Sequence, residues 1–323
     1  MKAAVLRAFG ESPRYEDVPT PQPGEGEELI AVTSASLNNI DRVKADGTHY
    51  SVGSPEAAGA LPAVVGVIGT GQLADGQRVL FGSQAGTMAE YALIRRVATF
   101  PIPDGVDDAT AAAIWNPGLS AWLTFAWKQP VEPGQTVLIL GATGVTGKLA
   151  VQLAKHFGAG RVIGAGRNKA VLAQLPELGA DATISIDAPE DEVTAAYRAN
   201  AGEHGYDIVV DYLWGRPTEI LIAAIAHNDG EIRRELTRLV QVGEMAGPRI
   251  SLAAGALRST GLEISAMGTG TMPPMDVIVG GLGELLDLVA AGKLRIDVRR
   301  APLSSVADLW SRDQAGRRTV FIP

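Results

Sequence analysis

A glycine-rich stretch in the middle of the chain limits the possible folds more than any other feature. Residues 136–158 read TVLILGATGVTGKLAVQLAKHFG, an apolar run followed by glycines and then by apolar residues at helical spacing. A strand, turn and helix of this kind is typical of two classes of nucleotide-binding protein. One is the phosphate-loop triphosphatases, and the other is the dinucleotide-binding folds.

The phosphate-loop interpretation fails at two positions. That loop requires a glycine five residues before the glycine of its Gly-Lys pair, and a Ser or Thr after the lysine to hold Mg²⁺. Here Ala142 stands five residues before Gly147, and Leu149 follows Lys148. The sequence therefore argues against a triphosphatase, and we expect Lys148 on a helix surface.

The dinucleotide interpretation agrees better with the same residues. Ala142, Gly144 and Gly147 have the spacing of the G-x-G-x-x-G fingerprint, with alanine at the first position. Gly144 would let the backbone approach a pyrophosphate, and Gly147 would let helix and strand pack closely. The first turn of the helix would supply amide donors. The remaining residues of the predicted binding loop are Thr143, Val145 and Thr146.

The surrounding residues predict an α/β fold with a doubly wound parallel sheet. Between residues 118 and 261 helical segments alternate with the short runs TVLILG, RVIGAG, ATISID, YDIVVDYL and RLVQVG. Apolar strands separated by helices are typical of a sheet covered on both faces. Residues 1–117 are rich in Gly, Pro and short β-prone runs, which predicts a β-rich domain. Residues 262–323 would add a last strand and return to that domain.

The end of the second predicted strand indicates NADP(H) as the cofactor. NAD-binding folds usually have an Asp or Glu about 20 residues beyond the loop, whereas an Arg there accommodates the extra phosphate of NADP. The sequence at this point is VIGAGRNK, without a carboxylate. Gly166 would leave room, Arg167 would form paired hydrogen bonds to the phosphate, and Asn168 would assist. In the alternative interpretation, Arg167 and Lys169 are solvent-facing charges at a helix start.

Composition and charge narrow the class of partner. The 323 residues have a net charge of -8 and no cysteine. The negative charge argues against nucleic acid or an anionic membrane surface as partner. The absence of cysteine excludes disulfides and thiolate metal sites. The N-terminus lacks the apolar core of a secretory signal, and no apolar run reaches the length of a membrane span. We therefore predict a cytoplasmic protein that acts on a small molecule.

The whole arrangement resembles the medium-chain dehydrogenase/reductase superfamily, and within it the zinc-independent quinone oxidoreductase branch. The resemblance rests on GLSA at residues 118–121, the glycine-rich loop, DYLWG at 211–215, LVQVG at 239–243 and GTG at 268–270. It implies a Rossmann-type sheet inserted into a β-rich GroES-like catalytic domain. It also adds cofactor-binding residues to the prediction: Ser120, Tyr212, Leu213, Val242, Gly243, Gly268 and Thr269.

The resemblance also implies a reaction that needs no metal. The zinc-binding motif of the alcohol dehydrogenases corresponds here to GVI at residues 66–68, which offers no zinc ligand. The histidines, at positions 49, 156, 204 and 227, lack ligand spacing. Because deprotonating an alcohol without a metal is difficult, we expect reduction of a quinone or an α,β-unsaturated carbonyl.

The resemblance carries three catalytic residues over to the segment LNNIDRVKADGTHY: Asn38, Asp41 and Tyr50. Asn39 stands where the family usually has proline, and Tyr50 lies one residue further from Gly47. Without the resemblance, Asn38 and Asp41 are as readily explained as turn-stabilising residues. Two functional classes therefore stay open. The chain is an NADPH-dependent reductase of quinones or enones, or it is an NADPH-binding sensing or interaction protein with little turnover.

The last predicted strand, LEISAMG at residues 262–268, indicates the assembly state. As the final strand of the sheet it would expose unpaired backbone groups, and only Glu263 protects it with charge. Pairing two such edges across a two-fold axis would satisfy those groups. Members of the family also commonly dimerise through these sheets. We therefore predict a homodimer, with Ile264 buried at or near the interface.

Overall fold

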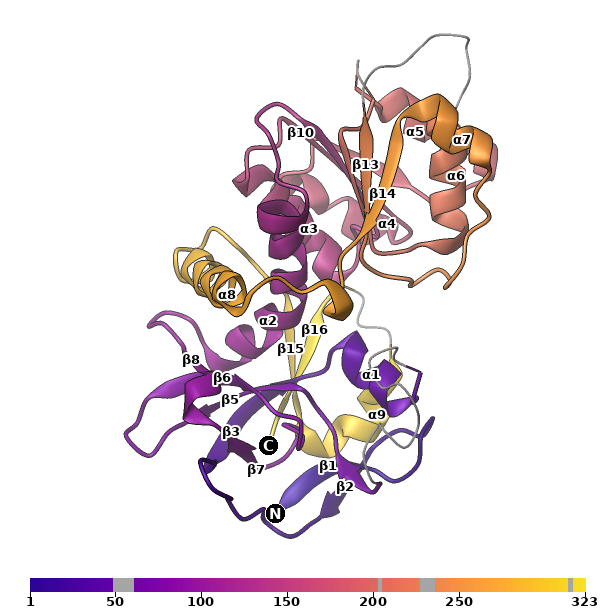
Figure 1. The fold of residues 1–323 in the computed structure, drawn as a ribbon. Coiled ribbons are helices and arrows are strands. Elements are labelled where there is room, and N and C mark those ends of the chain that lie inside the picture. Colours follow the sequence, from indigo (N-terminus) through magenta and orange to yellow (C-terminus); the bar gives the residue numbers. More distant parts are fainter. Residues whose placement is uncertain (49–60, 203–204, 227–235, 313–315) are drawn as a thin grey trace. The chain divides into compact units, whose positions relative to one another are not determined.

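The structure, a computed structural model, describes residues 1–48, 61–202, 205–226, 236–312 and 316–323 (Figure 1). The chain divides into two compact units. The first unit comprises Met1–Asn116 and Leu282–Pro323, and the second comprises Pro117–Gly281. Tyr50, one of the predicted catalytic residues, lies outside the described residues, as do His49, His204 and His227.

A six-stranded parallel sheet forms the centre of the second unit. When the strands are numbered by their order in the chain, their order across the sheet is 3-2-1-4-5-6. This is the Rossmann order. The second and third strands lie on one side of the first strand, and the fourth, fifth and sixth lie on its other side. The predicted α/β fold class is confirmed, and each of the six predicted strands is present. The strands are β9 (Thr136–Leu140), β10 (Arg161–Gly166), β11 (Ala182–Ser185), β12 (Ile208–Asp211), β13 (Thr237–Gln241) and β14 (Leu262–Ala266).

Helices cover both faces of this sheet (Figure 1). On one face, Leu138 and Leu140 of β9 belong to the same core cluster as Val193 of α5 and Leu221 of α6. Helix α3 packs on β9 and β10 from the opposite face. The helical elements of this part of the chain are α2 (Asp108–Leu123), a π-helical turn (Thr124–Lys128), α3 (Val145–His156), α4 (Lys169–Leu172), α5 (Glu190–Asn200), α6 (Gly215–Ile225), α7 (Ala254–Thr260) and α8 (Met275–Ala290).

One helical segment differs from the expectation. The apolar spacing of residues 168–178 predicts a continuous helix, but the structure has the short helix α4 followed by a 3-10 turn at Leu175–Leu178. Pro176 explains the break, because proline has no amide hydrogen to continue the helical hydrogen bonds.

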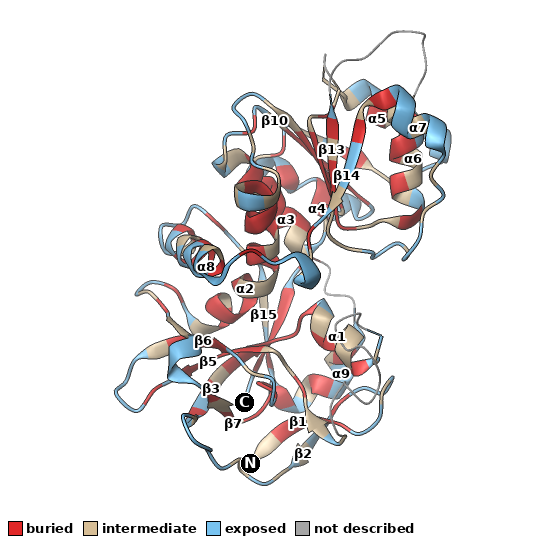
Figure 2. Cartoon of the chain, in the orientation of Figure 1, coloured by how far each residue is buried: buried red, intermediate tan, exposed pale blue. Residues whose placement is uncertain are grey.

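Burial distinguishes the central strands of the sheet from its edge (Figure 2). All four residues of β12 are buried. Among the strands in the described ranges, β14 pairs only with β13 and therefore forms the edge, as predicted. Glu263, Ile264 and Ala266 of β14 are exposed, Ile264 by 37% of its surface. The edge position is thus confirmed, and the homodimer stays a prediction.

The first unit contains two sheets with mainly antiparallel pairing. The larger sheet runs β15-β16-β3-β5-β6-β8, with β7 paired to β3, and the smaller runs β2-β1-β4. Their apolar faces enclose one core that includes Ile30, Phe81 and Trp310. The strands are β1 (Lys2–Leu6), β2 (Arg14–Asp17), β3 (Glu28–Ser36), β4 (Ala63–Val64), β5 (Ile68–Gln72), β6 (Arg78–Gly82), β7 (Tyr91–Ile94), β8 (Thr99–Pro101), β15 (Val298–Pro302) and β16 (Arg318–Ile322), and the short helices are α1 (Asn39–Ala45) and α9 (Val306–Trp310). None of the helices in the described ranges is long and apolar enough to cross a membrane.

Candidate functional site

The glycine-rich turn joins β9 to α3 where the strand order of the sheet reverses. Gly141 begins this turn with φ of +85°, a conformation that favours glycine. The amides of Gly141 and Ala142 both donate to the carbonyl oxygen of Ala165 at 2.9 Å. The first glycine of the turn is therefore Gly141 and not the position of Ala142. The sequence signal for it is a glycine at every third residue of GATGVTG.

The other two glycines keep the start of α3 clear of side chains. A Cβ atom at Gly147 would lie 2.2 Å from the carbonyl oxygen of Gly141, so no other residue fits. Gly144 is the N-cap residue and provides no side-chain cap for the first amides of α3. Those amides have no acceptor within the helix, and the helix dipole makes this end positive. The turn therefore has the form that a pyrophosphate requires.

Lys148, in the first turn of α3, corrects one expectation. The prediction that it lies on the helix surface is wrong, because only 6% of its surface is exposed. The physical reason is that α3 buries five successive residues, Gly147 to Val151. Lys148 therefore lies within the buried part of α3, whereas Val145 and Thr146 before it are half-buried.

The end of β10 lies against the glycine-rich turn. A Cβ atom at Gly166 would lie 2.5 Å from Cγ2 of Thr143, so the glycine is needed to accommodate that side chain. Arg167 is exposed and forms no hydrogen bond or ion pair with any other described residue. Asn168 caps α4 by accepting a hydrogen bond from the amide of Val171 at 3.2 Å.

The turns after β12 and β13 bring four predicted binding residues together. The amides of Val242 and Gly243 donate to the carbonyl oxygen of Asp211 at 2.8 and 3.1 Å. A Cβ atom at Gly141 would lie 3.3 Å from Cβ of Tyr212 and 3.1 Å from Cδ2 of Leu213. The glycine-rich turn therefore lies at the same end of the sheet, the carboxyl ends of the strands, as Tyr212, Leu213, Val242 and Gly243.

The hydroxyl group of Tyr212 is buried and has no hydrogen-bond partner among the described residues. Burial raises the pKa of this phenol, so the group is neutral and available as a donor. Buried polar groups in proteins nearly always have partners. An acceptor supplied by a bound molecule would account for this one.

The remaining cofactor-binding candidates are less closely connected. Ser120 is half-buried in α2, and its carbonyl oxygen accepts a hydrogen bond from the Thr124 hydroxyl at 2.9 Å. Gly268 follows β14 and donates its amide to the Thr271 hydroxyl at 3.0 Å. Thr269 is exposed in the next position. These local contacts hold each segment but do not by themselves connect it to the glycine-rich turn.

Asn38 and Asp41 lie together in the first unit, at the start of α1. The carboxylate of Asp41 is buried and accepts a hydrogen bond from the backbone amide of Asn38 at 2.6 Å. Burial raises the pKa of Asp41 to about 6, against the opposing effects of that amide and of the Arg318 charge. The side-chain amide of Asn38 donates from Nδ2 to the Ser36 hydroxyl at 2.9 Å. These contacts stabilise the turn, and a catalytic role for the two residues stays a prediction.

The buried Arg318 explains why an acidic residue is tolerated there. Its guanidinium donates to the carbonyl oxygen of Leu37 at 2.8 Å and is only 4% exposed. Burial lowers the pKa of Arg318 to about 10, and the charge of Asp41 opposes that change. The two charges therefore support each other within the core of the first unit.

In the segment that corresponds to the zinc-binding motif, Val67 and Ile68 stand at the motif's polar positions and carry no side-chain atom that could bind zinc. Gly66 has φ of +99°, and a Cβ atom there would lie 2.6 Å from Oγ1 of Thr87 and 2.9 Å from the Met88 amide nitrogen. In the described ranges no three His, Asp or Glu side chains are grouped so that they could hold a metal.

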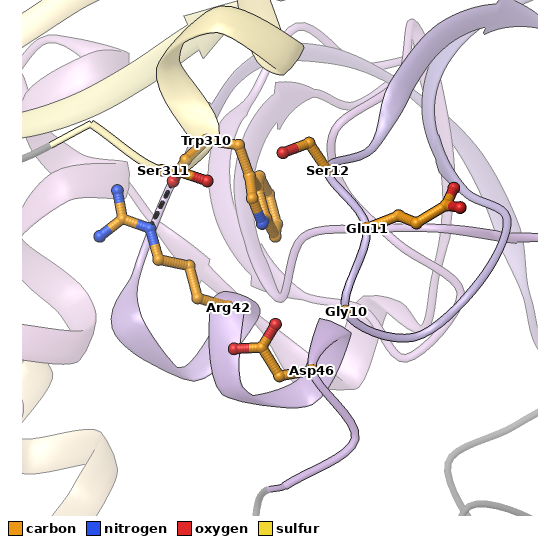
Figure 3. Close-up of a pocket in the computed structure, with 7 residues that line it drawn as sticks. All are labelled: Gly10, Glu11, Ser12, Arg42, Asp46, Trp310 and Ser311. Carbon is orange, nitrogen blue, oxygen red and sulfur yellow. Dashed lines mark hydrogen bonds between the residues drawn. The ribbon is translucent and has the colours of Figure 1, made fainter.

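A hollow in the first unit contains none of the predicted site residues (Figure 3). Arg42 at its side donates from Nε to the carbonyl oxygen of Trp310 at 2.6 Å, which turns the guanidinium away from the hollow. We assign the hollow no function. Its lining residues are Gly10, Glu11, Ser12, Arg42, Asp46, Trp310 and Ser311.

Comparison with known proteins identifies relatives of the chain. Residues 145–233 match the family model described as zinc-binding dehydrogenase. A quinone oxidoreductase-like protein 2 homolog of Nematostella vectensis is 29% identical over 70% of this chain, a match that spans 63% of the relative's length. A probable NADPH-dependent quinone reductase of Emericella nidulans is 25% identical over the full length of both chains.

Solved structures show the same fold over the whole chain. An NAD-dependent alcohol dehydrogenase superposes with a TM-score of 0.83 at 26% identity, with both chains covered completely. The Escherichia coli quinone oxidoreductase complexed with NADPH has a TM-score of 0.83 at 18% identity, also with complete coverage. With its Rossmann strand order and its glycine-rich turn, the chain has the fold of these structures, and in sequence it is similar to quinone oxidoreductases.

Proposed function

We propose that this oxidoreductase uses NADPH to reduce a quinone or an α,β-unsaturated carbonyl compound without a metal ion. The observation that carries the proposal is the turn after β9. There Gly141, Gly144 and Gly147 leave the first turn of α3 open to a pyrophosphate. The relatives named as quinone reductases support the same class of reaction.

Each binding residue has a distinct role in this proposal. The backbone of residues 143–146 would hold the pyrophosphate, and Arg167 would bind the 2′-phosphate. The side chains or backbone groups of Tyr212, Leu213 and the residues after β13 would line the rest of the site. When bound, NADPH supplies the hydride.

The preference for NADPH is supported by the residues at the end of β10. Residues 166–169 include no carboxylate that would bind the two ribose hydroxyls of NADH. Arg167 is exposed and has no hydrogen bond or ion pair with another described residue that would have to be broken first. A carboxylate in this segment would repel the 2′-phosphate of NADPH, and residues 166–169 contain none.

The chemistry on the acceptor side requires a donor for the oxygen that gains negative charge. We propose Asn38 and Asp41 as residues that orient the acceptor, and Tyr50 or a water molecule as the proton donor. Val67 and Ile68, which replace the polar residues of the zinc-binding motif, support a reaction without zinc.

The experiment that tests the proposal follows NADPH absorbance with a panel of quinones, enals and enoyl thioesters. The protein is first treated with a strong chelator and its zinc content is measured. We expect turnover of at least one acceptor by zinc-free protein. Binding of NADPH with no turnover of any acceptor would favour the sensing class instead, and activity that is lost and regained with zinc would refute the metal-free reaction.

A further inference from the structure

The turns that follow β12 and β13 pack into one structure, which we call the paired turns (residues 211–215 and 242–247). Backbone hydrogen bonds join them: Val242 and Gly243 donate to the carbonyl oxygen of Asp211, and Ala246 donates to that of Leu213 at 2.7 Å. These bonds connect segments about 30 residues apart in the chain. The two turns therefore cannot move independently.

Two glycines bring the paired turns into direct backbone contact. A Cβ atom at Gly215 would lie 2.7 Å from the carbonyl oxygen of Ala246. A Cβ atom at Gly243 would lie 2.8 Å from the carbonyl oxygen of Tyr212. Side chains at either position would push the turns apart, so the close contact is built into the sequence.

The Asp211 carboxylate lies inside the first of these turns. One of its oxygens accepts hydrogen bonds from the amides of Leu213 and Trp214 at 2.8 and 2.9 Å. The other accepts the Thr218 hydroxyl at 2.6 Å. Asp211 is fully buried, and burial raises the pKa of the carboxyl group against the effect of these three donors. Each hydrogen bond holds the turn or the start of α6.

Trp214 shows why the turn needs such support. Its φ of +54° and ψ of -162° belong to a region that residues other than glycine rarely adopt. Strained conformations persist only where the surrounding structure holds them, and here the hydrogen bond to Asp211 and the packing of the Trp214 ring against the core do so. Without the carboxylate, the turn would have reason to relax.

We infer that Asp211 is a positioning residue for the cofactor site. Its buried carboxylate holds the first of the paired turns, to which backbone hydrogen bonds join the second, in the conformation that presents Tyr212, Leu213, Val242 and Gly243. The inference rests on the proposed binding of NADPH. Since Asp211 acts through the turns and not on the 2′-phosphate, its loss weakens NADPH and NADH by the same factor.

The test compares Asp211→Ala with Asp207→Ala. Asp207 directly precedes β12 and Asp211 is its last residue, and Asp207 accepts the Thr136 amide at 2.7 Å at the opposite end of the sheet. Dissociation constants for NADPH and NADH are measured by fluorescence titration, at a temperature where circular dichroism shows each variant folded. We expect Asp211→Ala to raise both constants about tenfold, since hydrogen bonds to a charged group are lost. Asp207→Ala should change neither by more than about twofold, although it lowers stability.

Thr218→Val provides a second, milder variant should Asp211→Ala fail to fold. It removes only the donor to one carboxylate oxygen, so both dissociation constants should rise by a smaller common factor, and Thr218→Ser should restore them. Folded variants with wild-type affinity, or a loss confined to one cofactor, would overturn the role of Asp211. If the wild-type chain itself does not bind NADPH, the proposed function fails, and the inference fails with it.

Discussion

Replacing Arg167 by alanine measures how much the extra phosphate of NADPH contributes to binding. Arg167 is exposed and has no hydrogen bond or ion pair with another described residue, so the substitution should change stability by no more than about 0.5 kcal/mol. A hydrogen bond to a charged group is worth roughly 1.5 to 3 kcal/mol. At about 1.4 kcal/mol per tenfold, this corresponds to a loss of roughly ten- to 150-fold in affinity. Because the site is open to solvent, we expect the lower part of that range.

The assay is a titration of the purified protein with NADPH and, separately, with NADH. Arg167→Ala should weaken NADPH by about tenfold or more and leave NADH within about twofold. Arg258→Ala, which removes an exposed arginine from α7 of the same unit, controls for the loss of one positive charge. An equal loss of affinity for both cofactors, or an equal effect of the two substitutions, would refute the assignment of Arg167.

Three further predictions concern stability and assembly. Tyr212→Phe should stabilise the cofactor-free protein in urea unfolding by about 1 kcal/mol, because it removes an unpaired buried hydroxyl, and should weaken NADPH several-fold. Tyr197→Phe, which removes another buried hydroxyl without a partner among the described residues, should stabilise the protein without affecting NADPH binding. Asp41 has a raised pKa, so the wild-type protein should lose stability relative to Asp41→Asn as the pH rises from about 4 to 6, by at most about 3 kcal/mol. Ile264→Pro, which removes a backbone donor from the edge strand, should dissociate or destabilise the predicted homodimer in light scattering.

Each of these predictions has a result that contradicts it. Lower stability of Tyr212→Phe would mean that its hydroxyl has a partner after all. A gain of wild-type stability over Asp41→Asn with rising pH would show that attraction to Arg318 outweighs burial. A wild-type protein that is monomeric at micromolar concentration would rule out the homodimer.

The strands of the second unit could be predicted from sequence because each depends on a local pattern. Residues 137–140, for example, are all apolar and all buried, which is typical of a strand covered on both faces. The class of fold follows from the alternation of such runs with helices. Loop geometry is harder to predict. The first glycine of the turn is Gly141, whose left-handed conformation depends on how the chain leaves β9.

Contacts between distant segments could not be read from the sequence. The interpretation of Lys148 as a surface residue is wrong because burial of α3 depends on what packs around it. Asp211 is recognisable in the sequence as part of a motif. The hydrogen bonds that its carboxylate accepts from the amides of Leu213 and Trp214 depend on the conformation of Trp214 and could not be predicted. The same is true of Asp41 and Arg318, which lie more than 270 residues apart in the chain and are brought together only by the fold.

The most direct test of the account is transfer of deuterium from NADPH that carries deuterium at both C4 positions of the nicotinamide. The labelled cofactor is incubated with the zinc-free protein and an enone that it turns over, and the product is analysed by mass spectrometry and NMR. We predict one deuterium at the β-carbon of the reduced enone, and none at that carbon when unlabelled NADPH is used in deuterated water. Product without deuterium from the cofactor, or no reduction by protein that binds NADPH, would contradict the proposed hydride transfer.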